Sequence, residues 1–164
     1  MNDAVIRSVR HEVWADTELL KFCASISPEQ LAWTAAGTYG TIHNTLQHIV
    51  RAQRGYVGLL DGDWDREDVP PDTERLLPVA DLIDKERGVG ERIEKILARE
   101  FDPTRVLKLT DGTVTAGIVL AQFIHHGSDH RAHVGTILGA GGVEPPNLDL
   151  WAYSIVNGEG KNNT

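Results

Sequence analysis

Four long stretches of this chain repeat apolar residues at the period of an α-helix, and this feature restricts the possible folds more than any other. In each stretch an apolar side chain returns every three or four residues, which gathers the apolar side chains on one helix face. The predicted helices cover about residues 3–23, 42–60, 79–99 and 115–138. Amphipathic helices of this length bury their apolar faces against one another, so the sequence predicts an all-α fold, a four-helix bundle.

The segments between the predicted helices differ in character. Ser27 and Pro28 are typical helix-start residues, and residues 31–33 after them form either one short helical turn or an extended piece. Residues 64–78 are rich in proline and acidic groups, which predicts a long crossover connection on the surface. Apolar and polar residues alternate around the dipeptide 111–112, Asp-Gly, which predicts a short hairpin or extended arm before the fourth helix.

The length and composition fit one domain with its own core. The chain has 164 residues, of which 41% are hydrophobic. We expect a single domain over residues 1–157, with an extended segment after Pro146, and a flexible polar tail at residues 158–164. The only cysteine, Cys23, is expected to be a small buried hydrophobic residue, and a lone cysteine fits a reducing cytoplasm.

The charge of the chain limits the classes of partner that it is expected to bind. The formal net charge is −8, which argues against a nucleic-acid partner and against an anionic membrane surface. No basic region followed by an apolar run opens the chain, and no apolar run reaches the length of a membrane span. We therefore expect a cytoplasmic protein whose partner is neither a nucleic acid nor a membrane.

Histidines are concentrated in the fourth predicted helix. Four of the seven lie within nine residues, at positions 125, 126, 130 and 133. His126 and His130 are four residues apart, which stacks their side chains one turn apart on one helix face. Because apolar residues precede and follow them on that face, the histidines are expected to face the bundle interior at mid-height. A lone histidine on an apolar face is more often a hydrogen-bonded core residue, but a stacked pair of neutral imidazoles favours a divalent transition metal.

A third ligand would come from a facing helix, and His48 is the natural choice. It lies halfway along the second predicted helix, next to the core position Ile49. His133 shares the face of the stacked pair and is interpreted as a pocket wall or proton shuttle rather than a fourth ligand. Tyr56, on the same helix face as His48, is a second candidate for proton transfer.

The other histidines and Arg131 are not expected to bind the metal. His125 lies about 100° around the helix from His126, so it is expected near the site or on the surface. His11 and His43 are expected on the surface. Arg131 either anchors its helix, meets an anionic substrate or forms a surface ion pair.

Other catalytic motifs are missing from the sequence. There is no glycine-rich phosphate loop, no His-Glu-x-x-His zinc motif and no partner pattern for thiol catalysis at Cys23. The paired Glu-x-x-His ligands of a di-iron bundle are also missing. The histidine constellation is therefore the only candidate site that the sequence offers.

Two segments of the chain resemble the DinB-like superfamily of metal-binding four-helix bundles. They are Tyr-Gly-Thr-Ile-His-Asn-Thr-Leu-Gln-His-Ile-Val at 39–50 and Ile-His-His-Gly-Ser-Asp-His-Arg-Ala-His-Val at 124–134. The second segment looks like the family's His-x-x-x-His-Arg motif. The Asp-Gly arm at 111–112 and the stretch at 145–153 are also similar, so the resemblance covers nearly the whole chain. One departure is His133, because the family often has Gly-Gln where this chain has Ala-His.

The resemblance implies three metal ligands, His48, His126 and His130, for nickel, zinc or iron, and it implies a homodimer. Members of the family include thiol S-transferases that use bacillithiol or mycothiol, a mycothiol-dependent maleylpyruvate isomerase, and proteins described as metal-dependent hydrolases. The leading hypothesis is thus a metal-dependent enzyme in which water or a low-molecular-weight thiol attacks a small electrophile. The alternatives are a non-catalytic metal- or ligand-binding stress-response protein and a structural helical protein with incidental histidines.

Overall fold

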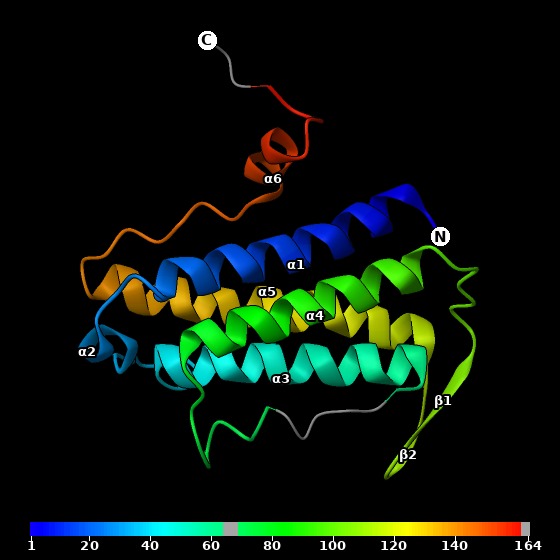
Figure 1. Ribbon diagram of the computed structural model, residues 1–164, viewed down its shortest axis with the longest axis horizontal. Helices are drawn as coiled ribbons and strands as arrows, with labels where there is room; N and C mark the ends of the chain where they lie inside the picture. The colour runs from blue at the N-terminus through cyan, green and yellow to red at the C-terminus, as the bar shows by residue number, and fades with distance from the viewer. Residues whose placement is uncertain (64–68, 162–164) are drawn as a thin grey trace.

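Four long helices form the body of the protein (Figure 1). In the computed structural model, which describes residues 1–63 and 69–161, they are α1 (Asp3–Cys23), α3 (Ile42–Asp61), α4 (Val79–Leu97) and α5 (Ala116–Ala140). The predicted all-α four-helix bundle is confirmed. Within the described residues, no helix combines the length and the apolar character that crossing a membrane requires.

The long helices pack as a square in which each contacts two others. α3 packs against α5 and α4, and α1 packs against α4 and α5. α3 and α4 run in the same direction in Figure 1, so the chain between them must return the length of a helix. That requirement explains the long crossover predicted at residues 64–78, of which 64–68 lie outside the described residues.

Short elements complete the fold. One helical turn, α2 (Pro28–Leu31), follows Ser27, whose side chain and that of Gln30 form a capping box. The predicted hairpin is confirmed as β1 (Val106–Leu109) paired antiparallel with β2 (Gly112–Thr115). The helix bounds follow from local signals as well: Thr41 caps α3, which ends at Gly62 in the left-handed conformation with φ of 84°.

The segment after Pro146 was expected to be extended, and this prediction is wrong in part. Residues Leu150–Val156 form a helix, α6, whose first turn is capped by the side chain of Asp149. Seven residues are too few to show a helical period, so only the cap could have indicated this helix. Of the predicted flexible tail, residues 162–164 lie outside the described range.

Two histidines expected on the surface are half-buried. His11 donates from Nε2 to the backbone carbonyl of Leu148 at 2.7 Å, and its ring contacts Trp14 and Tyr153. His43 donates from Nε2 to the carbonyl of Leu77 at 2.8 Å. Each histidine thus ties a helix to a segment that passes over it, a role that depends on the path of a distant segment and has no signal in the local sequence.

A layer of buried charge divides the core into two apolar clusters. One cluster contains Leu19, Ile42 and Val134, and the other contains Val57, Ile93 and Phe123. The polar residues Glu12, Asp16, Gln53 and Glu86 are at most 1% exposed, and Arg131 is 9% exposed. Of the roles considered for Arg131, the structure therefore favours the helix anchor, and the anchor lies inside the bundle rather than on the surface.

Arg131 on α5 holds two carboxylates of α1. Its Nη1 donates to Glu12 Oε1 and Asp16 Oδ1, both at 2.7 Å, and its Nη2 donates to Glu12 Oε2 at 2.8 Å. Gln53 of α3 donates from Nε2 to Asp16. Neither oxygen of Glu86 has a hydrogen-bond partner among the described residues, and burial, followed by the charges of Asp16 and Glu12, raises its pKa well above the ordinary value.

Gly127 allows Glu12 to reach α5. A Cβ atom added at Gly127 would overlap the Oε1 atom of Glu12, and it would come within 3.1 Å of Arg131 Nη1. A glycine in the middle of a helix weakens that helix, so its presence here is explained by the close approach of the carboxylate.

We predict that Gly127→Ala destabilises the protein by about 3 kcal/mol, because the methyl group displaces Glu12 from its buried ion pair. Urea unfolding measures the change in the free energy of unfolding. Gly135→Ala on the same helix is the matched control, since a Cβ added there meets no described atom within 4 Å apart from its chain neighbours and the backbone of its own helix. The control should gain up to about 1 kcal/mol from helix propensity. Equal effects of the two substitutions would contradict this account.

Candidate metal centre

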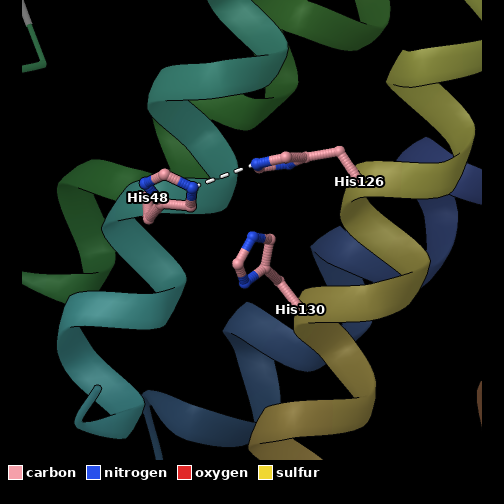
Figure 2. A group of neighbouring side chains, drawn as sticks. All are labelled: His48, His126 and His130. Carbon is pink, nitrogen blue, oxygen red and sulfur yellow. Dashed lines mark hydrogen bonds between the residues drawn. The ribbon is translucent and has the colours of Figure 1, made fainter. Parts of the chain in front are cut away.

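Three imidazoles from two helices converge on one point (Figure 2). His48 comes from α3, and His126 and His130 come from α5. One nitrogen of each ring lies within 4.8 Å of the corresponding nitrogens of the other two. The Nε2 atoms of His48 and His126 are 3.0 Å apart, close to the roughly 3.3 Å expected for two nitrogens on a tetrahedral zinc ion.

The histidines lie at the edge of the buried face of α5. They were expected to face the interior at mid-height, but all three are only half-buried. The innermost row of α5 at this level consists of Gly127, Arg131 and Val134, which pack toward α1 and the core. Because a helix turns about 100° per residue, this row leaves His126 and His130 pointing at α3. The site therefore opens toward the outside along the α3–α5 contact.

The electrostatic environment keeps these imidazoles neutral. Burial and the neighbouring histidines lower the pKa of His126 and of His130 to about 4. Burial also lowers the pKa of His48. A neutral imidazole carries a free lone pair, which is the state that a metal ligand needs.

The hydrogen bonds of the cluster fit a metal site better than a core of paired histidines. The Nδ1 atoms of His126, His130 and His133 are buried and have no hydrogen-bond partner among the described residues. His48 and His126 point their Nε2 atoms at each other, and at least one of two such neutral nitrogens must carry a proton to avoid lone-pair repulsion. A cation between the rings would remove that conflict, and a set of three nitrogen donors suits a transition metal.

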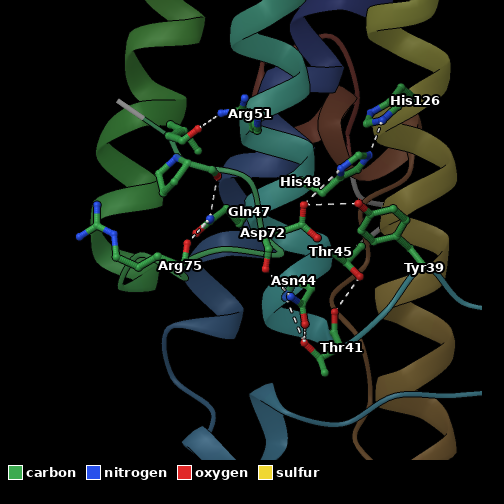
Figure 3. Close-up of polar contacts among 12 residues, drawn as sticks. Tyr39, Thr41, Asn44, Thr45, Gln47, His48, Arg51, Asp72, Arg75 and His126 are labelled. Atoms are coloured by element: carbon green, nitrogen blue, oxygen red, sulfur yellow. Dashed lines mark hydrogen bonds and ion pairs between the residues drawn. The ribbon is translucent and has the colours of Figure 1, made fainter. Parts of the chain in front are cut away.

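Asp72 and Tyr39 border the site on one side (Figure 3). The Oδ1 atom of Asp72 lies 3.8 Å from His48 Nδ1 and accepts a hydrogen bond of 3.4 Å from the Tyr39 hydroxyl. The Tyr39 ring stacks on His48 with centroids 4.1 Å apart and meets His130 edge-on at 5.0 Å. Neither role was predicted from the sequence, although Tyr39 belongs to the motif at 39–50.

Side chains of α3 fix the crossover so that Asp72 reaches His48. Gln47 donates from Nε2 to the carbonyls of Pro70 and Arg75 and accepts the Leu77 amide at Oε1, with distances of 2.6–2.9 Å. Asn44 donates to the carbonyl of Asp72 at 2.9 Å. Figure 3 shows the contacts of Gln47 with Arg75 and of Asn44 with Asp72. Because the hydrogen bonds of Gln47 and Asn44 join residues 23 to 30 positions apart, no local pattern could have located Asp72.

The other predicted residues lie around the cluster. The ring centroid of His133 is 5.3 Å from that of His130, and Tyr56 meets His126 edge-on at 5.6 Å. Both therefore border the three-histidine group without joining it. His125 and Asp129 are exposed.

Comparisons with known proteins agree with this architecture. The sequence matches the DinB family over residues 1–161. A solved structure of a DinB-like protein from Bacillus cereus ATCC 10987 is similar to this chain with a TM-score of 0.62 and 20% identity. The match covers 87% of this chain and 94% of that protein, and at this identity it supports the fold alone. No curated protein matches the sequence.

In the metal-free protein, we predict that His126 and His130 make stability depend on pH. The unfolded chain binds protons at these imidazoles near the ordinary pKa of 6.5, whereas the folded chain binds them only near 4. Between these values the unfolded state binds more protons, so this contribution to the free energy of unfolding falls as the pH drops from 6.5 to 4. Urea unfolding at several pH values measures it.

The control is the double variant His126→Gln with His130→Gln. It is needed because burial, followed by the charge of Asp16, raises the pKa of the Glu12 carboxyl, and a carboxyl with a raised pKa has the opposite pH dependence. The difference between wild type and double variant isolates the histidines. The same pH slope in both proteins would refute the prediction.

Proposed function

This chain belongs to the DinB family, and on that basis we propose that it is a metal-dependent enzyme acting on a small electrophile. His48, His126 and His130 hold a divalent transition metal, with nickel, zinc or iron as the candidates. The observation that carries the proposal is the convergence of three neutral ring nitrogens within 4.8 Å of one another. Three protein ligands leave a position open, which is typical of catalytic rather than structural metal sites.

A bound divalent ion lowers the pKa of a water or thiol in its open position and so supplies a nucleophile at neutral pH. Whether water or a low-molecular-weight thiol takes that position separates a hydrolase from a thiol S-transferase. The homodimer expected from the resemblance stays a prediction.

The surrounding residues of the chain have defined tasks in this proposal. Asp72, whose Oδ1 lies 3.8 Å from His48 Nδ1, favours the tautomer with the proton on Nδ1 and so keeps Nε2 free for the metal. Tyr39 covers the rings of His48 and His130 and excludes water from that side. His133, beside His130, and Tyr56, against His126, are the candidates to exchange a proton with the substrate.

We predict that untagged protein carries about one metal ion per chain and that His130→Ala loses it. Removing one of three ligands should reduce metal affinity by more than the roughly 10–100-fold that loss of an outer hydrogen-bond partner costs. Elemental analysis measures the metal, and the rise in melting temperature on adding nickel or zinc measures the binding. Turnover of thiols with electrophiles, and hydrolysis of esters and amides, measures activity.

His125→Ala is the matched control, because it removes an exposed imidazole from the same helix without touching the cluster. It should keep both metal and activity. Metal binding without turnover of any thiol or ester would favour the non-catalytic stress-response protein instead. If the protein binds no metal and a chelator does not destabilise it, the third hypothesis, a structural helical protein with incidental histidines, would be favoured.

Asp72→Asn tests the positioning of His48. We expect metal affinity to fall about tenfold, because the amide keeps the shape of the side chain but loses the charge that holds the His48 N–H. The metal-free protein should unfold at nearly the same urea concentration as the wild type. Asp129→Asn removes the same charge from an exposed position near the site and should leave the affinity unchanged. Equal losses in both variants would show that only the net charge matters.

A further inference from the structure

A cleft of about 690 Å³ opens between the hairpin and the α3–α5 pair. This volume is in the range of sites that hold drug-sized molecules. Side chains from all three elements form its apolar wall, which consists of Tyr56, Leu59, Leu109, Val114, Ile118 and Val119.

Tyr56 lies between the cleft and the histidines. It belongs to the wall of the cleft, and the ring of Tyr56 meets the ring of His126 edge-on at 5.6 Å. Gln122, which also borders the cleft, lies one helical turn before His126 on α5. Tyr39 and Asp72 border the other end of the cluster, near His48 and His130. The cleft therefore approaches the candidate metal centre from the end that those two residues leave uncovered.

The side chains that line the cleft favour a neutral, mainly apolar ligand. The charged residues of the lining are Lys108 and Asp111, whose opposite charges cancel. The chain as a whole carries a net charge of −8, which disfavours an anionic ligand. Ile118 is 61% exposed and Leu109 is 43% exposed, so apolar surface is available for a ligand to cover.

We propose that this cleft binds the body of a neutral, mainly apolar small molecule and directs its reactive group past Tyr56 to His126. The description of that molecule as the substrate rests on the proposed function. The binding itself needs no metal, since none of the three histidines lines the cleft.

The test uses N-phenyl-1-naphthylamine, a neutral apolar dye that fluoresces when it leaves water, with the full chain freed of metal by a chelator. We expect saturable binding at one site per chain. Ile118→Asp should weaken binding about tenfold, because it places a charge on the apolar wall. Ile118 lies exposed in the first turn of α5, where an acidic residue is favourable, so the variant should fold normally.

The control is Val156→Asp, which places the same charge on exposed apolar surface of α6, where Val156 is 68% exposed and lies outside the cleft. Binding should be unchanged in this variant. The anionic dye 1-anilinonaphthalene-8-sulfonate, of similar size, should bind several-fold more weakly than the neutral dye. The proposal is overturned if no saturable binding occurs, if Val156→Asp weakens binding as much as Ile118→Asp, or if the anionic dye binds more tightly.

The outcome can be separated from that of the proposed function. Dye binding is measured without metal, so a protein that shows no turnover can still show the cleft site. In the converse case, the enzyme turns over substrate while Ile118→Asp leaves its dye binding unchanged. That result would support the metal centre and overturn the cleft as the substrate site.

Discussion

The buried ion pair of Arg131 with Glu12 and Asp16 sets the geometry on which the candidate site depends. Removing these charges from water costs several kcal/mol per ion, and hydrogen bonds offset that cost only when the geometry is good. The pair therefore specifies one rotation of α5 about its axis, with Arg131 facing α1. At that rotation His126 and His130 face α3, where His48 lies. Gly127 contributes by admitting Glu12 to the surface of α5.

The sequence was sufficient for the features that local rules govern. The four long helices and the hairpin follow from periodicity and turn chemistry, and the structure confirms them. The convergence of His48 with His126 and His130 followed from helical spacing and from the resemblance to a known family, and the structure brings these residues together.

Other features depend on contacts between distant segments, which periodicity does not encode. Asp72 reaches His48 only because Gln47 and Asn44 hold the crossover, and His11 is half-buried only because the chain before α6 passes over it. The depth of the histidines was misjudged for a related reason. Arg131 was not recognised as an inward-facing residue, and its burial shifts the centre of the inner face of α5 away from His126 and His130.

The burial of Glu86 couples folding to the binding of a proton. Its carboxyl group is fully buried, neither oxygen has a hydrogen-bond partner among the described residues, and its pKa is raised well above the ordinary 4.5. In the unfolded chain the same group is ionised at neutral pH. Because folding raises this pKa, there is a pH range in which the folded chain holds a proton at Glu86 that the unfolded chain has lost. Folding in that range takes up a proton from the buffer, so the heat of folding then includes the ionisation enthalpy of whichever buffer is present.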